Sequence, residues 1–252
     1  MKRGQILLIT VMLLATLMTV VLSVSFQSIT ETQVSKLEEE NQKALAAAEA
    51  ALEAALKQGA GTVIIGEGAL SSLTDFTGSA SVETATSNQF TTSSIIKDGS
   101  YTFYLENYDP VTKTFSGESL GTEDITVCFQ SGTTIPALEI TLVKDSGVKK
   151  YVVDPDSRIS NAEAGTPPSV NCPSGYVYSI DLHLADIGTD TKLIEARVLY
   201  ASTKVFITRT TDLPLQGKTI TSQAQSATGV SKKITLFQSY PQIPSEFFST
   251  SF

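Results

Sequence analysis

The residues with types and spacing suited to catalysis are few and lie far apart in the chain. Residues 117–121, Gly-Glu-Ser-Leu-Gly with Ser119 at the centre, match the Gly-x-Ser-x-Gly turn that carries the nucleophile of many serine hydrolases. That turn requires a strand before the serine and a helix after it, whereas this segment is a polar turn between stretches typical of strands. His183, the only histidine, falls on the solvated face of a predicted strand. We therefore interpret the motif as a hairpin turn and predict that the chain is not an enzyme.

Patterns for cofactors and metals also fail on spacing. Residues 217–219, Gly-Lys-Thr, end like a phosphate-binding loop, but Asp212 stands where the leading glycine is required. Asp154, Asp156 and Asp186 offer oxygen ligands for calcium, without the order of an EF-hand loop. A calcium site of another loop type stays open as an alternative. One histidine and two distant cysteines do not form a zinc site, so we expect no cofactor and no metal.

The two cysteines, Cys128 and Cys172, both follow the long apolar segment near the N-terminus. Thiols outside the cytoplasm usually pair, and the membrane orientation that the N-terminal segment predicts places both residues outside. We predict a disulfide that ties the proline-containing segment 167–171 to the outer face of a strand over residues 125–129. Two unpaired buried thiols are the alternative.

The N-terminal segment has the composition of a membrane span. No charge occurs between Arg3 and Glu31, and residues 6–26 are mostly Leu, Val, Ile, Met and Phe. Such a stretch rises about 32 Å as a helix, which matches the hydrocarbon core of a bilayer. Lys2 and Arg3 precede it, so the N-terminus is expected in the cytoplasm and the remainder outside. The alternative is a cleaved secretory signal ending near residues 23–25, although its apolar stretch is typically shorter.

The helical pattern continues beyond the predicted span. Residues 29–57 contain no Gly or Pro and are rich in strong helix formers, and Gly59 is suited to end the helix. We predict one helix over residues 5–58, about 80 Å long. Its apolar positions follow 3-4 spacing and include Val34, Leu37, Ala44, Ala48, Ala51 and Ala55. Small residues permit close approach of a partner, so we expect another helix, the chain's own C-terminal domain, or each at a different height to cover this stripe.

The exported part reads as a β domain. Residues 59–99 are rich in Gly, Ser and Thr and are interpreted as a connector with a little local structure. From residue 100 onward apolar residues alternate with period two. Residues 124–155 and 179–210 align as two copies of a three-stranded meander. The predicted fold class is α+β: a long N-terminal helix, half transmembrane and half amphipathic, followed by an antiparallel β-rich domain over residues 100–252.

The charge of the chain excludes one class of partner. The formal net charge is −8 at pH 7, and no run of Lys and Arg interleaved with aromatic residues offsets it. Because phosphate backbones repel such a chain, we expect no nucleic-acid partner.

The N-terminal residues also carry a family resemblance. The short basic leader 1–4, which ends in Gly4, and the apolar run that starts at Gln5 resemble the class III signal of type IV pilins and pseudopilins. Residues 43–52, Lys-Ala-Leu-Ala-Ala-Ala-Glu-Ala-Ala-Leu, are similar to a segment of PilX-type minor pilins. The resemblance covers about residues 1–57. It implies that prepilin peptidase cuts between Gly4 and Gln5, that Gln5 is N-methylated, and that the helix packs with other pilin subunits.

One departure from the pilin pattern bears on the role. Major pilins carry glutamate at the fifth mature position, where this chain has Ile9. An unpaired buried ammonium is costly, so the usual docking of one subunit below another is missing. The resemblance therefore implies a minor subunit of a type IV pilus or related filament, anchored in the inner membrane, with a role in assembly, initiation or adhesion. The alternative is a membrane-tethered binding protein or adhesin that does not polymerise.

Overall fold

The computed structural model describes residues 3–83, 86–117, 123–167 and 171–247. The chain forms two compact units: the first comprises residues 1–83 and 220–236, and the second comprises residues 84–219 and 237–252. Residues 84–219 of the second unit thus interrupt the sequence of the first, and residues 237–252 follow it. One long N-terminal helix followed by antiparallel sheets confirms the predicted α+β class.

Helix α1 (Arg3–Gln58) is uninterrupted over 56 residues. It ends where predicted: Gly59 adopts a left-handed φ of 78°, and its N–H donates to the carbonyl of Ala55 at 2.9 Å. Every side chain from Leu8 to Glu39 is exposed. Because so many apolar side chains are unfavourable in water, the N-terminal half of α1 requires an apolar environment.

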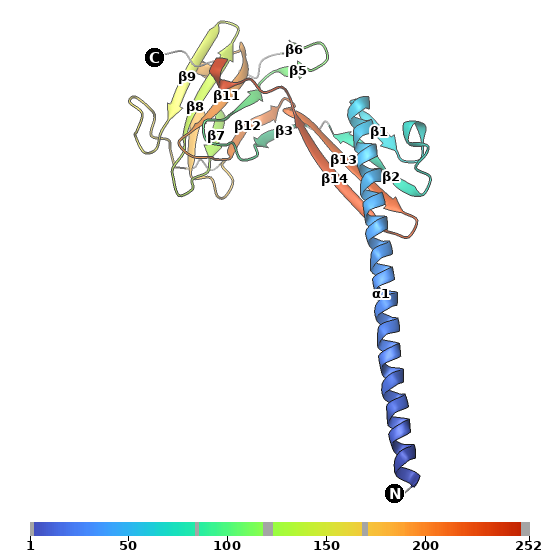
Figure 1. Ribbon diagram of the computed structural model, residues 1–252. Helices are drawn as coiled ribbons and strands as arrows, with labels where there is room; N and C mark the ends of the chain where they lie inside the picture. The colour runs from blue at the N-terminus through green and yellow to red at the C-terminus, as the bar shows by residue number, and fades with distance from the viewer. Residues whose placement is uncertain (1–2, 84–85, 118–122, 168–170, 248–252) are drawn as a thin grey trace. The chain divides into compact units, whose positions relative to one another are not determined.

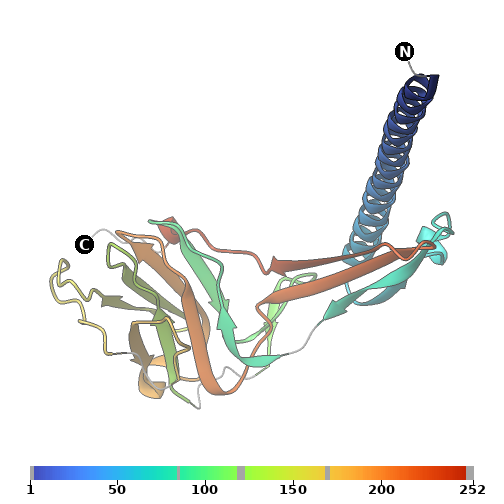
Figure 2. The same ribbon diagram turned by 90° about the horizontal axis from the view of Figure 1, so that it is seen from below.

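A four-stranded antiparallel sheet covers the C-terminal part of α1 in the first unit. Its strand order is β1-β2-β13-β14, and Figure 1 shows these strands beside the helix. The strands are β1 (Gly61–Ile64), β2 (Phe76–Glu83), β13 (Gly217–Ser226) and β14 (Ser231–Ser239), with a short 3-10 helix η1 (Gly68–Leu70) between the first two. The two long neighbours β13 and β14 appear orange and red in both views (Figures 1 and 2).

The core of the first unit explains why the alanine stripe exists. Ala47, Ala48, Ala51 and Ala55 are buried against the sheet, which contributes buried residues such as Ala80. The chain's own sheet therefore covers this part of the stripe, as one of the expected alternatives proposed. Farther toward the N-terminus Val34 and Leu37 are exposed.

The interpretation of residues 59–99 as a connector was wrong. This segment holds β1, η1 and β2 of the first unit and β3 (Ser87–Thr91) of the second. The physical reason is the helix on which this segment packs, because a strand that packs on the alanines of α1 needs few large side chains. In strand β2, Phe-Thr-Gly-Ser-Ala-Ser-Val-Glu, Phe76, Ala80 and Val82 do alternate with polar residues and face the core, but glycine and alanine fill two of the four positions on that face and weaken the pattern.

The second unit contains a β-sandwich. One sheet has the order β10-β7-β12-β3 and the other the order β4-β11-β8-β9, and both contribute side chains to one core. The strands are β4 (Ser100–Tyr104), β7 (Ile125–Phe129), β8 (Ala137–Lys144), β9 (Gly147–Val153), β10 (Tyr178–Leu182), β11 (Thr191–Leu199) and β12 (Val205–Leu213). A two-stranded sheet, β5 (Asn107–Asp109) and β6 (Thr114–Ser116), and the short helices α2 (Leu184–Ile187) and η2 (Ser245–Phe247) complete the unit.

The two predicted meanders do not form. In a meander each strand pairs with the next in sequence, but β7 pairs with β10 and β12, and β8 pairs with β9 and β11. The strands that aligned as repeats pair with each other instead, β7 with β10 and β8 with β11. Alternation identifies a strand and its buried face but not its neighbour, and each copy here contributes to both sheets of one sandwich.

Candidate functional site

The first candidate site is the exposed N-terminal half of α1. In the part of the chain that the structure describes, α1 is the one helix long and apolar enough to cross a membrane, with a mean hydropathy of 2.3 over its apolar window. This is consistent with a single-pass membrane protein. Gly4 and Gln5 lie in the first turns of the helix, whereas Met1 and Lys2 lie outside the described residues. Cleavage between Gly4 and Gln5 stays a prediction.

The predicted disulfide between Cys128 and Cys172 is present, with an S–S distance of 2.04 Å. Cys128 lies on the face of β7 opposite Val127 and Phe129, as the alternation indicated. That face is not solvated at this point: Cys128 is fully buried and packs with Tyr176 and Phe206. The bridge therefore fixes the segment after residue 171 onto the outer face of the sheet.

The residues considered for catalysis are not gathered by the fold. Ser119 lies outside the described residues. His183 follows the end of β10 and precedes α2, where its exposed ring lies 3.5 Å from Asp124, measured from Nδ1 to Oδ2. Gly217 begins β13, a strand rather than a phosphate-binding loop.

The aspartates considered for calcium have other roles. Asp154 is fully buried, and it accepts hydrogen bonds from the Arg158 guanidinium at 2.6 and 3.1 Å and from the N–H groups of Arg158 and Ile159. The Asp186 carboxylate accepts hydrogen bonds from the Lys149 ammonium and the Tyr151 hydroxyl. Among the residues that the structure describes, no group of three or more His, Cys, Asp or Glu side chains is placed to hold a metal ion.

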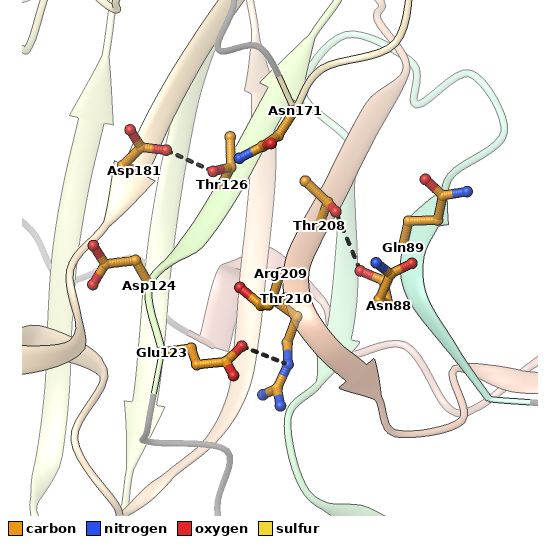
Figure 3. Close-up of a pocket in the computed structure, with 10 residues that line it drawn as sticks. All are labelled: Asn88, Gln89, Glu123, Asp124, Thr126, Asn171, Asp181, Thr208, Arg209 and Thr210. Carbon is orange, nitrogen blue, oxygen red and sulfur yellow. Dashed lines mark hydrogen bonds and ion pairs between the residues drawn. The ribbon is translucent and has the colours of Figure 1, made fainter.

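The second candidate site is a pocket of about 740 Å³ on the outer face of the sheet β10-β7-β12-β3. Its floor is a row of polar side chains in register across all four strands. Asp181 of β10 is opposite Thr126 of β7, Thr126 is opposite Thr208 of β12, and Thr208 is opposite Gln89 of β3. Direct cross-strand partners in an antiparallel sheet share a face. Figure 3 shows these four residues in this succession.

Hydrogen bonds fix the two threonines of the floor. Thr126 donates its hydroxyl proton to Asp181 Oδ1 at 2.6 Å, and Thr208 donates to the backbone carbonyl of Asn88 at 3.2 Å (Figure 3). Both threonines are only 7 % exposed. The middle of the row is therefore buried, whereas Asp181 and Gln89 at its two ends are exposed.

A buried arginine closes one end of the pocket. The Arg209 side chain is 3 % exposed, and its Nε lies 4.0 Å from Glu123 Oε2 (Figure 3) and donates to the carbonyl of Thr211 at 2.9 Å. Burial lowers the pKa of Arg209, while Glu123 and Asp212 oppose this shift. The guanidinium nonetheless stays charged, because arginine titrates far above neutral pH.

The disulfide and a helix start hold the other walls. Asn171 precedes Cys172, which is bonded to Cys128 two residues along β7 from Thr126. Asp124 accepts the N–H of Leu184 at 2.7 Å, and this backbone hydrogen bond, the largest cause, lowers the pKa of Asp124. The chain beside Asn171 and the carboxylate of Asp124 are thus each held in place, although both side chains are exposed.

Sequence reasoning missed this pocket. One signal was present: the alignment that suggested repeats placed Thr126 and Asp181 at equivalent positions, and these two residues are hydrogen-bonded neighbours. Thr208 and Gln89 join them only through the pairing of β12 with β7 and β3, which alternation does not reveal.

Comparison with known proteins does not identify a relative for either candidate site. No family model matches the chain, and a search of curated proteins finds no match.

Proposed function

We propose that this chain is a minor pilin-like or pseudopilin-like subunit of an extracytoplasmic type IV pilus or related filament. One observation carries the proposal: a single helix presents an exposed apolar N-terminal half and, near its C-terminal end, buries a stripe of alanines against its own sheet. Such a helix joins a soluble domain to a lipid bilayer and, by its exposed half, to other helices of the same kind. The leader ending in Gly4 and the segment 43–52 support the same assignment.

Charge and redox chemistry support the proposed orientation. Lys2 and Arg3 precede the apolar segment, which supports a cytoplasmic N-terminus. The disulfide between Cys128 and Cys172 supports an oxidising compartment for the second unit. Together they favour the inner membrane, with both β units on the outer side.

A second candidate function is a membrane-tethered binding protein that never enters a filament. Ile9 favours it, because the glutamate that docks major pilins is missing. The pocket on the inserted second unit is compatible with both candidates, since a filament subunit can also present a binding surface.

Co-expression with an active prepilin peptidase tests the proposal. The wild-type chain should lose four residues and appear in sheared surface filaments, whereas Gly4→Leu should stay full length and remain in the membrane. A wild-type chain that stays intact beside a processed control pilin would overturn the pilin assignment. Cleavage without any incorporation into filaments would favour the tethered binding protein.

A further inference from the structure

We propose that the polar pocket of the second unit binds a saccharide through its hydroxyl groups. The pocket, at about 740 Å³, lies within the range of roughly 300–1,000 Å³ that small-molecule sites occupy. All ten lining residues drawn in Figure 3 are polar. An apolar ligand gains little from such a lining, so the ligand must be one that exchanges hydrogen bonds with water for hydrogen bonds with protein. The inference does not depend on the filament role.

The charge of the pocket excludes anions. Glu123, Asp124 and Asp181 contribute three negative charges and Arg209 one positive charge, which leaves the lining with a balance of −2. Arg209 is already engaged by Glu123 and by the Thr211 carbonyl. A phosphate, sulfate or carboxylate group would therefore meet repulsion with no uncommitted guanidinium to offset it.

The direction of the hydrogen bonds within the pocket floor determines which functional groups a ligand needs. Thr126 and Thr208 both give their hydroxyl protons to protein acceptors, so toward the pocket they offer lone pairs. Asp181 uses Oδ1 for Thr126 and offers its other oxygen in the same row. The floor is thus rich in acceptors, and the amide of Gln89 supplies both a donor and an acceptor. Neutral hydroxyl groups, which donate and accept, match this set.

The spacing suits a ligand with several hydroxyls on one rigid frame. Cross-strand partners lie about 4.5–5.5 Å apart, and the row of four residues repeats this interval across the sheet. A sugar ring or a short glycan presents hydroxyls in a fixed pattern at comparable intervals. Rigid partners lose little conformational entropy on binding, and here both the floor and the walls are anchored, by Thr126–Asp181 and by the disulfide next to Asn171.

A cationic peptide side chain fits less well. Each carboxylate already accepts one hydrogen bond from the protein: Asp124 from the Leu184 N–H, Glu123 from the Thr211 N–H at 3.0 Å, and Asp181 from the Thr126 hydroxyl. The Arg209 guanidinium lies in the same pocket and repels a second cation. A lysine-rich peptide is therefore retained as a competing outcome of the test and not as the proposal.

The test uses the full chain in lipid nanodiscs, because glycoside detergents would themselves occupy a saccharide site. Labelled protein is applied to an array of glycans and to a lysine-rich peptide, and bound glycans are titrated by calorimetry. Thr208→Val keeps the shape and removes the hydroxyl, and Asp181→Ala removes the acceptor at the end of the row. Thr133→Val, at an exposed threonine of the same unit that does not line the pocket, is the matched control.

We expect saturable binding of at least one glycan class by the wild type and by Thr133→Val. One lost hydrogen bond should weaken the affinity about tenfold in Thr208→Val, with a similar loss in Asp181→Ala. The inference is overturned if no glycan binds, if neither variant weakens binding, or if the lysine-rich peptide alone binds. Tyrosine circular dichroism of each variant verifies that the second unit stays folded.

Discussion

The hydroxyl group of Ser222 in β13 donates a hydrogen bond to the backbone carbonyl oxygen of Ala48 in α1, at 2.7 Å. Both residues are fully buried. A strand can reach the backbone of a helix at this distance only where the helix carries a small side chain. Ala48 is therefore required for the packing of the sheet on the helix, and not only as a good helix former.

Ala48→Leu should open the first unit. Overpacking a tight contact costs about 1–3 kcal/mol, so amide protection in β2 and β13 should fall by a corresponding amount. Hydrogen–deuterium exchange is the suitable measurement, because all eight tyrosines lie in the second unit and tyrosine signals do not report on the first. Ala46→Leu, at an exposed position of the same helix, is the control. Equal protection in the two variants would contradict the packing described.

Gly78 of β2 should tolerate no side chain. Its φ is 147°, and a Cβ atom there would lie 2.0 Å from the backbone oxygen of Gln223. Gly78→Ala should therefore push β2 away from β13 and destabilise the first unit by more than about 2 kcal/mol, again measured by hydrogen exchange. Gly132→Ala, whose Cβ would meet its nearest atom only at 4.0 Å, should have little effect. A wild-type exchange pattern in Gly78→Ala would show that the two strands do not approach as described.

Loss of the disulfide should weaken the second unit. The bridge closes a loop with a sequence separation of 44, and the loop-entropy model assigns such a link about 3–4 kcal/mol. Cys172→Ser should lower the free energy of unfolding by that amount, followed by tyrosine fluorescence in urea. A reductant should destabilise the wild type and leave the variant unchanged. If the reductant shifts both proteins equally, the bridge is not the cause.

Asp154 should make stability depend on pH in the acid range. Burial alone raises the pKa of its carboxyl, but hydrogen bonds from Arg158 and Ile159 outweigh burial and hold the pKa below its ordinary value. A depressed folded-state pKa contributes stability that is complete above the unfolded value, about 3.9, and is lost as the pH falls through the lower folded value. We expect the wild type to lose stability below about pH 4 for this reason.

Two variants isolate this contribution. Asp154→Asn should lower the free energy of unfolding at pH 7 by about 2–3 kcal/mol and flatten the acid dependence. Asp156→Asn should do neither, since Asp156 is largely exposed and lies 3.6 Å from the Arg158 guanidinium. Tyrosine fluorescence in urea between pH 2 and pH 7 measures both effects. An unchanged acid slope in Asp154→Asn would assign the pH dependence to other groups.

Leu14→Arg should impair membrane insertion. A charge near the centre of a spanning helix costs about 2.5–3.5 kcal/mol on insertion scales. Leu37→Arg provides the matched control, because Leu14 and Leu37 are similarly exposed in the chain itself, at 64 % and 53 %, and only Leu14 lies within residues 6–26. The fraction resistant to alkaline extraction should fall for Leu14→Arg alone. An equal fall for both would place the membrane boundary elsewhere.

The sequence predicts those features that depend on local patterns. Helix α1 and its end at Gly59 follow from composition and a single glycine, and the pairing of Cys128 with Cys172 follows from the count and the inferred compartment. Strands such as β7 and β10 follow from alternation. Each of these features is encoded within one segment or by two residues of one kind.

What the sequence does not predict depends on which segments become neighbours. Strand β2 escaped notice because Ala80 and its neighbours need only match the alanines of α1. The meanders were expected because the alternation of apolar residues does not determine which strands pair with each other. The pocket depends on β12 lying between β7 and β3, so that Thr126, Thr208 and Gln89 meet. Only tertiary pairing brings those residues together.

The mass of the N-terminal peptide, from native membranes and from sheared surface filaments, tests the proposed function most directly. A pilin-like subunit should begin at an N-methylated Gln5 in both fractions and retain the whole apolar half of α1. A chain that begins at Met1 in both fractions, or one trimmed near residue 25, would contradict the proposed function.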